Sequence, residues 1–432
     1  MNGAQALVQT LVDSEVTVCF GNPGTSEMHF LGALDGNQAI RSVLCLSEGV
    51  VSAAADGYAR MTRRPAATLL HLGPGLANAG ANLHNAKRAS TPIVNIVGDH
   101  ATYHQHLDAP LTANVEALAR TWSTWVGTSR SARSVAQACG AEILVETASA
   151  RLERGAGRVP MEAIPYVVDD AVARLAGFEQ CLLVGAGAPV AFFAYPGKRG
   201  LLLPDDCEIA VAAHPDEDGR ATLGMLARRL DAGHLPPRRI PAGAQRTIPS
   251  GALTSAAIGA ALANRMPDNA IICDESITLG AAIAAATRDA RPHSWPQLTG
   301  GAIGIGLPLA AGAAVACPRA KVIVLQADGS AMYTNQALWT HARENLDIVS
   351  IILSNRSYAI LKHELANVGV DHPGPTALAM TSLRNPDIDW VSLARAMGVE
   401  GASTDTALGF DALLAEALDR PGPFLIEAVL DR

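Results

Sequence analysis

The chain has 432 residues, of which 49% are hydrophobic and 17% charged, so it can bury large interiors and is not expected to be disordered. Its net charge is −8 and only 4% of its residues are aromatic, which argues against nucleic acid or an anionic membrane as a partner. The most apolar stretch, Gly301–Val315, is interrupted by glycines and a proline and is too short to span a bilayer. We expect a protein of two or three domains with neither a nucleic-acid nor a membrane partner.

The start of the chain and its cysteines indicate a cytoplasmic protein. Met1–Thr10 lacks the basic start and the long apolar run of a signal peptide. The seven cysteines are scattered, odd in number and form no C-x-x-C motif, as is typical of buried thiols in a reducing compartment. The cytoplasm is therefore the expected location.

The first domain is expected to span residues 1–137 and to contain a parallel sheet. Asn2 and Gln5 resemble a capping box that opens an amphipathic helix through Val12. Strand-like apolar runs then alternate with helical patterns, at Val16–Phe20, Ser42–Leu46, Ala67–Leu72 and Ile93–Val97. Continuous apolar strands separated by helices predict a parallel sheet that helices cover on both faces.

The rest of the chain predicts a smaller middle domain, residues 138–240, and a second parallel-sheet domain, residues 241–432. The strands expected in the middle domain are Glu142–Glu146, Cys181–Val184 and Cys207–Val211. A linker rich in Pro, Arg and Gly follows at Asp231–Pro249. The strands expected in the last domain are Ala270–Cys273, Val322–Gln326, Ile348–Leu353 and Phe424–Val429. The predicted fold class is α/β, with two parallel-sheet domains flanking a short α/β middle domain.

Oxygen-bearing side chains follow two strands of the last domain. Asp328 comes just after one strand and Asn355 just after the next, so both are expected at the carboxyl edge of the sheet, where ligands bind. Together with the Ser357 carbonyl, these oxygens suit Mg²⁺ completed by phosphate oxygens and water. The alternative is a pair of ordinary strand-end turns.

A second candidate is Glu48, which lies between an apolar strand and a helix of small residues, Ala53–Arg60. A carboxylate at a helix start interacts favourably with the helix dipole, which is the purely structural interpretation. The motifs around Glu48 and Asp328 together resemble thiamine-diphosphate enzymes of the acetolactate synthase and benzoylformate decarboxylase family. The resemblance implies that Glu48 contacts N1′ of the cofactor's aminopyrimidine.

In that family a G-D-G motif, a helix and an N-N pair close the metal site. Asp328 and Asn355 are 27 residues apart, which fits the family's spacing. Ala327 replaces the first Gly and Ser354 the first Asn, and neither position coordinates the metal in the family. The resemblance therefore implies two cofactors, thiamine diphosphate and Mg²⁺.

Other motifs extend the resemblance along the chain. Gly21–Glu27 looks like the G-N-P-G-x-x-E loop of benzoylformate decarboxylase, with Thr25 in the place of its catalytic Ser. His71 follows a strand at the position of that enzyme's active-site His. The implied catalytic residues are thus Glu48, His71 and Thr25. A strand-end histidine and a turn threonine are the alternatives.

The loop Gly300–Pro308 is similar to the family loop beside the cofactor. The resemblance implies that Ile303 is the apolar wedge under the bent cofactor and that the Gly301 carbonyl faces the 4′-amino group. Glu275–Thr278 matches a diphosphate-binding turn, with Thr278 as hydroxyl donor. Further cofactor contacts are expected from Gly329 and Ser330. Glycine-rich packing and ordinary caps are the alternatives.

Two features of the middle region bear on function. Gly185–Pro189 resembles the start of a dinucleotide fingerprint but lacks the third glycine and the acidic residue, so no nucleotide is expected there and an oxidoreductase is disfavoured. The segment Ala191–Pro196 has no clear counterpart of the family's second active-site His. Its adjacent Phe192 and Phe193 are expected in the core.

The resemblance implies a decarboxylase or carboligase acting on a small 2-oxo acid, similar to acetolactate synthase. A benzoylformate decarboxylase-like lyase is the first alternative. A homodimer or homotetramer is expected, because the domains of Glu48 and Asp328 come from opposite subunits in the family. The chain is shorter than its relatives, with the gap near Gln137–Ala138, where the last strand of the first domain is expected to be missing. A cofactor-binding but inactive protein is therefore the second alternative.

Overall fold

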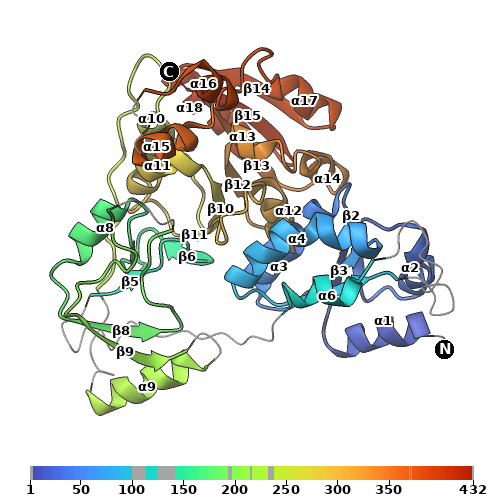
Figure 1. Ribbon diagram of the computed structural model, residues 1–432. Helices are drawn as coiled ribbons and strands as arrows, with labels where there is room; N and C mark the ends of the chain where they lie inside the picture. The colour runs from blue at the N-terminus through green and yellow to red at the C-terminus, as the bar shows by residue number, and fades with distance from the viewer. Residues whose placement is uncertain are drawn as a thin grey trace.

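The computed structural model describes residues 3–99, 113–123, 142–192, 197–214, 217–231, 238–368, 370 and 372–430. It contains a four-stranded sheet near the N-terminus, a seven-stranded sheet near the C-terminus, and two small sheets between them in sequence. In Figure 1 the N-terminal unit (blue) and the middle unit (green) lie at opposite sides below the C-terminal unit (yellow to red). The predicted α/β fold with two parallel-sheet units is confirmed.

The N-terminal sheet has the strand order β2-β1-β3-β4, and all its strands are parallel. Its strands are β1 (Val18–Gly21), β2 (Arg41–Leu44), β3 (Ala66–Leu70) and β4 (Ile93–Val97). Its helices are α1 (Gly3–Asp13), α2 (Met28–Asp35), α3 (Glu48–Thr62), α4 (Leu72–Arg88) and α6 (Val115–Arg120). The first helix runs one residue beyond the predicted end at Val12, and Asn2 of the predicted capping box lies outside the described residues.

The C-terminal sheet has the order β14-β15-β13-β12-β10-β11-β6. Its strands are β6 (Arg151–Arg154), β10 (Ala270–Glu275), β11 (His293–Pro296), β12 (Val322–Ala327), β13 (Ile348–Ser354), β14 (Glu400–Thr404) and β15 (Phe424–Val429). Its helices are α10 (Ser255–Arg265), α11 (Gly280–Ala286), α12 (Gly306–Ala316), α13 (Asp328–Ala331), α14 (Ala337–Arg343), α15 (Ala359–Asn367), α16 (Pro375–Met380), α17 (Trp390–Ala396) and α18 (Ala407–Asp419). All four strands predicted for this domain are present.

The edge strand β6 comes from the segment assigned to the middle domain, yet it pairs antiparallel with β11. Arg151 also donates to the carbonyl oxygen of Arg60 in α3, at 3.1 Å. This strand therefore touches both parallel-sheet units.

The middle unit contains two separate two-stranded parallel sheets. Its elements are β5 (Leu144–Val145), β7 (Glu162–Ala163), α8 (Val168–Leu175), β8 (Gln180–Val184), β9 (Glu208–Ala213) and α9 (Gly219–Arg229). All three predicted strands exist, as β5, β8 and β9, but β5 pairs with β7 and not with the other two. The predicted domain boundary at residues 137–138 lies outside the described residues.

Helices α3 and α12 cross with their backbones in contact. A side chain on Gly57 would overlap the carbonyl oxygen of Leu309, and one on Gly312 would overlap that of Ala54. Both glycines thus allow a close approach that no larger residue permits. The crossing fixes the start of α3, where Glu48 lies, relative to the glycine-rich loop before α12.

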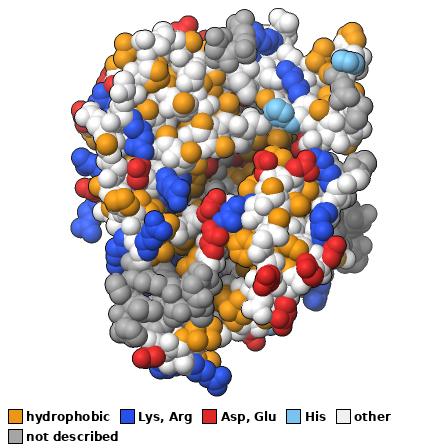
Figure 2. Space-filling view, turned by 90° about the vertical axis from the view of Figure 1, so that its left-hand side faces the viewer, with side chains coloured by type: hydrophobic (Ala, Val, Ile, Leu, Met, Phe, Trp, Pro, Cys, Tyr) orange, Lys and Arg blue, Asp and Glu red, His pale blue; other side chains and the backbone are white. Residues whose placement is uncertain are grey.

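The surface is of mixed character. In Figure 2 one face is hollowed near its centre, and acidic and basic side chains are interspersed around the hollow. Within the described ranges, no helix is long and apolar enough to cross a membrane. The six cysteines of these ranges are free.

Two fully buried histidines are expected to make the fold acid-sensitive. His341 donates from Nε2 to the Leu307 carbonyl at 2.9 Å, and His293 from Nδ1 to the Arg291 carbonyl at 2.8 Å. Burial lowers the pKa of each to about 4, whereas the unfolded chain titrates near its ordinary value of 6.5. Between these values the unfolded chain binds more protons, so the free energy of unfolding falls as the pH is lowered from 6.5 towards 4, by up to ~1.4 kcal/mol per pH unit for each histidine.

The measurement is a series of urea unfolding curves between pH 7 and pH 4. His341→Gln should reduce the slope of stability against pH relative to the wild type, because the amide can still donate to Leu307 but does not titrate. Identical slopes for the two proteins would mean that His341 does not contribute to acid sensitivity.

Candidate active site

Glu48 is the first residue of α3 and is buried. Asn22 donates to its Oε1 at 3.1 Å and Asn78 to its Oε2 at 3.3 Å. The polypeptide forms a helix start here because the preceding Ser47 is an N-cap whose side chain accepts from the Gly49 N–H. The two amides orient a carboxylate in a largely dry position, which is the arrangement a proton-transferring group requires.

His71 lies at the N-terminal end of α4, and its Nδ1 is 2.8 Å from Oε2 of the buried Glu27. The same carboxylate oxygen accepts from the Gly24 N–H at 2.9 Å. Gly24 lies so close to the His71 ring that any side chain there would overlap it. Thr25 begins the short helix η1 (Thr25–Glu27), and its side chain lies outside the described part of the structure.

Asp328 and Asn355 follow the neighbouring parallel strands β12 and β13, as predicted. Asp328 is buried and accepts from the Arg356 N–H at 2.6 Å and from the Gly329 N–H at 2.8 Å. Burial raises the pKa of Asp328 to about 6, although these two N–H groups oppose the shift. A cation at this edge would offset the cost of keeping this carboxylate charged.

The neighbours of Asp328 form a tight turn structure. Asn355 Oδ1 accepts from the Ser357 N–H at 3.0 Å, and Ser357 Oγ donates to the Thr381 carbonyl at 3.1 Å. No group of three or more His, Cys, Asp or Glu side chains suited to a metal occurs among the described residues. A metal here would depend on Asp328, an amide, a carbonyl and oxygens from outside the chain.

The next residues of α13 pack inward. The Ser330 hydroxyl donates to the Ala327 carbonyl at 3.1 Å and accepts from Gln326 Nε2 at 2.8 Å. Gly329 lies beside the Tyr358 ring, where a side chain would overlap the ring. Thr278 is half-buried in the short helix η3 (Ile277–Leu279).

The glycine-rich loop before α12 is held by buried side chains. Glu275 accepts from the Gly304 and Gly306 N–H groups, each at 2.7 Å, and burial raises the pKa of its carboxyl. Gln326 accepts from the Leu307 N–H at 3.1 Å. Gly301 has φ +75°, a conformation that favours glycine, and Ile303 is half-buried.

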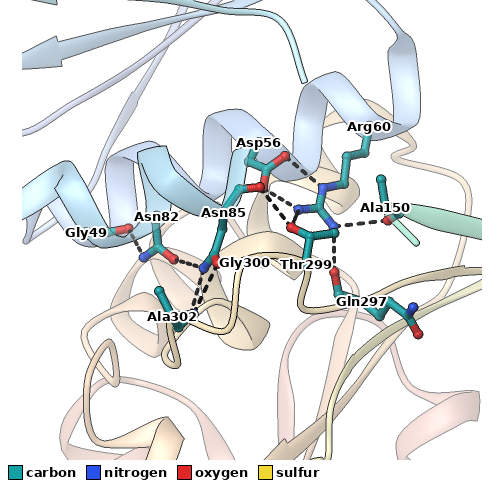
Figure 3. Close-up of polar contacts among 10 residues, drawn as sticks. All are labelled: Gly49, Asp56, Arg60, Asn82, Asn85, Ala150, Gln297, Thr299, Gly300 and Ala302. Carbon is teal, nitrogen blue, oxygen red and sulfur yellow. Dashed lines mark hydrogen bonds and ion pairs between the residues drawn. The ribbon is translucent and has the colours of Figure 1, made fainter. Parts of the chain in front are cut away.

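The N-terminal unit reaches this region through α3 and α4 (Figure 3). Arg60 pairs with Asp56 in a buried ion pair at 2.6 Å and donates to the Gln297 carbonyl at 2.7 Å. Gly49, the neighbour of Glu48, lies close to the Thr334 side chain. Within the described residues, no hydrogen bond or ion pair joins the Glu48 and Asp328 carboxylates. The polar residues around Glu48 and those around Asp328 therefore form two separate clusters.

The expectation that Phe192 lies in the core is wrong. Its side chain is 47% exposed, and its ring edge lies against Gly301, where a side chain would come within 2.6 Å of Phe192 Cζ. The Tyr166 ring, 39% exposed, is 5.6 Å from the Phe192 ring. The Phe192 ring therefore lies against the glycine-rich loop, with the Tyr166 ring next to it, and Phe193 lies outside the described residues.

Several residues with a place in the site were not singled out from the sequence: Asn22, Glu27, Asn78, Asn85, Glu275 and Gln326. Glu27 and Glu275 were recognised only as motif members. The available signal for both was a carboxylate beside a glycine-rich stretch whose backbone N–H groups need acceptors. Asn22 is also a motif member, of Gly21–Glu27, whereas Asn78 and Asn85 act across elements, so nothing local in the sequence marks these two.

Family descriptions match both parallel-sheet units of the chain. The description "Thiamine pyrophosphate enzyme, N-terminal TPP binding domain" matches residues 1–119, and its C-terminal counterpart matches residues 277–428. A Mycobacterium tuberculosis protein with the name "Putative acetolactate synthase large subunit IlvX" is 42% identical over 100% of this chain and 99% of its own length. Benzoylformate decarboxylase of Pseudomonas aeruginosa is 27% identical, over 95% and 96% of the two chains.

A solved structure with a similar fold comes from another thiamine diphosphate-dependent enzyme. The structure of a thiamine diphosphate-dependent 4-hydroxybenzoylformate decarboxylase from Rhodococcus jostii superposes with a TM-score of 0.82, at 23% identity, over 100% of this chain and 99% of that one. The match to the M. tuberculosis protein runs over 514 positions, more than the 432 residues present here, so this chain lacks segments of that relative. The chain belongs to the thiamine pyrophosphate enzymes, in the family of acetolactate synthase and benzoylformate decarboxylase.

Proposed function

We propose that the protein is a thiamine-diphosphate- and Mg²⁺-dependent 2-oxo-acid decarboxylase or carboligase, similar to acetolactate synthase. The observation that carries the proposal is the buried Glu48 carboxylate, oriented by Asn22 and Asn78 at the start of α3. A structural helix-start carboxylate would be exposed to solvent or paired with a cation, and within the described part of the chain Glu48 is neither.

The residues present fit the cofactor and its metal. Asp328, Asn355 and the Ser357 carbonyl would hold Mg²⁺, since Asp328 and Asn355 follow neighbouring parallel strands and supply oxygens at one sheet edge. Thr278, Gly329 and Ser330 would lie along the diphosphate. Ile303 would support the bend of the cofactor, and the Gly301 carbonyl would accept from its 4′-amino group.

When bound, the thiazolium ring supplies a nucleophilic carbon and accepts the electron pair released with CO₂. Glu48 would hold a proton at N1′ of the aminopyrimidine. His71 keeps Nδ1 on Glu27, which leaves Nε2 to exchange a proton with the substrate. Thr25 would assist with its hydroxyl group.

A benzoylformate decarboxylase-like lyase is the second candidate, and one observation favours it. The exposed Phe192 ring beside Gly301, with the exposed Tyr166 ring next to it, offers an apolar surface that a phenyl group covers better than a methyl group does. The third candidate is a cofactor-binding but inactive protein, which the segments missing relative to the M. tuberculosis protein support.

One experiment separates the three candidates. The protein with thiamine diphosphate and Mg²⁺ is incubated with pyruvate and, separately, with benzoylformate, and CO₂, aldehyde and acyloin are measured. Acyloin from pyruvate supports the synthase, and aldehyde from benzoylformate supports the lyase. Glu48→Gln serves as the background control. Absence of CO₂ from both 2-oxo acids while the cofactor is demonstrably bound would support the inactive protein.

We further propose a cytoplasmic homodimer or homotetramer with active sites between subunits. Large apolar side chains near the edge that carries Asp328 support a covered surface there, since Tyr333 is 58% and Met380 76% exposed in the single chain. Light scattering coupled to size-exclusion chromatography measures the mass of the assembly directly.

A further inference from the structure

Helix α4 of the N-terminal unit holds the backbone of the glycine-rich loop (Figure 3). Asn85 Oδ1 accepts from the N–H groups of Gly300, at 3.1 Å, and Ala302, at 3.3 Å. Asn85 Nδ2 donates to the Ala302 carbonyl at 2.7 Å. His84 Nε2 lies 3.1 Å from the Gly300 carbonyl, and Thr299 donates to the Asn85 carbonyl at 2.8 Å.

These contacts fix the direction of the Gly301 carbonyl. The Gly301 C=O and the Ala302 N–H belong to one planar trans peptide group, in which they point in opposite directions. Because the Ala302 N–H points to Asn85, the Gly301 carbonyl points away from α4. Gly301 itself is exposed, and among the residues that the structure describes none donates to its carbonyl.

Asn85 is itself firmly placed. It is fully buried, and its Nδ2 also donates to Asn82 Oδ1 at 3.0 Å. Asn82 in turn donates to the Gly49 carbonyl at 3.0 Å, next to Glu48. Two hydrogen-bonded asparagines, Asn82 and Asn85, thus link the backbone beside Glu48 to the backbone beside Gly301.

We infer that Asn85 is a positioning residue that aims the Gly301 carbonyl at the 4′-amino group of the cofactor. The inference rests on the proposed function, because it requires thiamine diphosphate to lie against this loop. Asn85 itself does not touch the cofactor. A simple tether between the two units is the competing explanation, and it predicts no dependence on the 4′-amino group.

The test compares two ligands by titration calorimetry at a fixed, saturating Mg²⁺ concentration. These are thiamine diphosphate and its 4′-deamino analogue, which lacks the group that the Gly301 carbonyl would accept from. Asn85→Ala should weaken thiamine diphosphate about tenfold, the upper range for one hydrogen bond, and change the affinity for the analogue by less than about twofold. Equal weakening of both ligands, or of neither, overturns the inference.

Two further variants distinguish a selective loss of ligand binding from a general loss of folding. Asn85→Leu fills the same space without an acceptor and should reproduce the selective loss. Asn85→Asp keeps an acceptor for the Gly300 and Ala302 N–H groups but loses the donor to the Ala302 carbonyl and to Asn82 Oδ1, so it should retain only part of the preference for the 4′-amino ligand. A loss of preference in Asn85→Asp as large as in Asn85→Leu would contradict the positioning role.

A matched control removes another polar contact between the same two units. Arg41 pairs with Glu344 at 2.7 Å, away from the loop, and Arg41→Ala should leave both affinities unchanged. Weakening of both ligands by this control would point to a general effect of docking. If wild-type protein binds neither ligand, the proposed function fails first, and that outcome is distinct from an Asn85 variant that binds like the wild type.

Discussion

Asp328→Ala is expected to abolish the binding of thiamine diphosphate at ordinary Mg²⁺ concentrations. Asp328 supplies the one carboxylate in the proposed oxygen set, and Mg²⁺ binds such sites through one or two carboxylates plus substrate phosphates. Without it, the diphosphate would lie against amide and carbonyl oxygens with no bridging cation to neutralise it. We expect affinity to fall by more than about 100-fold, beyond the usual effect of losing a supporting neighbour of a ligand.

The measurement is calorimetric titration of the cofactor at several Mg²⁺ concentrations. Asp328→Asn is the companion variant, because its single amide oxygen can still accept from one of the Arg356 and Gly329 N–H groups, which bond to different Asp328 oxygens, so part of the turn is kept while the charge is lost. Asp389→Ala, which removes the N-cap of α17, controls for the loss of an acidic side chain elsewhere. Unchanged affinity in Asp328→Ala would disprove the metal assignment.

Glu48→Gln is expected to keep the cofactor and to lose proton exchange at thiazolium C2. The amide has the shape of the carboxylate but cannot hold or release the proton at N1′, and acid–base groups typically contribute about 10²- to 10⁴-fold in rate. Its NH₂ group would also face one of the two donors, Asn22 and Asn78, so a modest loss of stability should accompany the change.

Exchange is followed by NMR in deuterated buffer, with cofactor affinity measured in parallel. Asn78→Ala is a useful comparison, because it keeps the carboxylate and removes one of its two orienting donors. Its exchange rate should lie between those of the wild type and Glu48→Gln. A wild-type exchange rate in Glu48→Gln would show that the carboxylate is structural.

The sequence was sufficient for the parts of the fold and site that depend on local pattern. Strands β4 and β15 have the predicted bounds, since each is a mainly apolar run with a single polar residue, Asn95 in β4 and Glu427 in β15. Asp328 and Asn355 could be paired from sequence because both follow neighbouring parallel strands, whose carboxyl ends share one edge. Their position follows from topology alone.

Other features could not be predicted, for physical reasons. Asn85 is 215 residues from Gly300, so nothing near it in the sequence reports the contact. Phe192 is a large apolar residue and was therefore expected in the core. Its exposure depends on where the middle unit lies beside the glycine-rich loop, which the local sequence does not report. Strand β6 has no apolar alternation, because its charged side chains make ion pairs and stack on Trp295.

Strand β6 also limits how this protein can be divided. It covers the edge of β11, and Arg154 lies over the ring of the buried Trp295 at 4.3 Å. A fragment that starts at residue 241 would contain the matched segment 277–428 in full, yet it would leave β11 as an open edge with an uncovered indole. Open edges pair with other chains, so such a fragment is expected to aggregate. A deletion through Arg151–Arg154 would open the same edge in the whole protein.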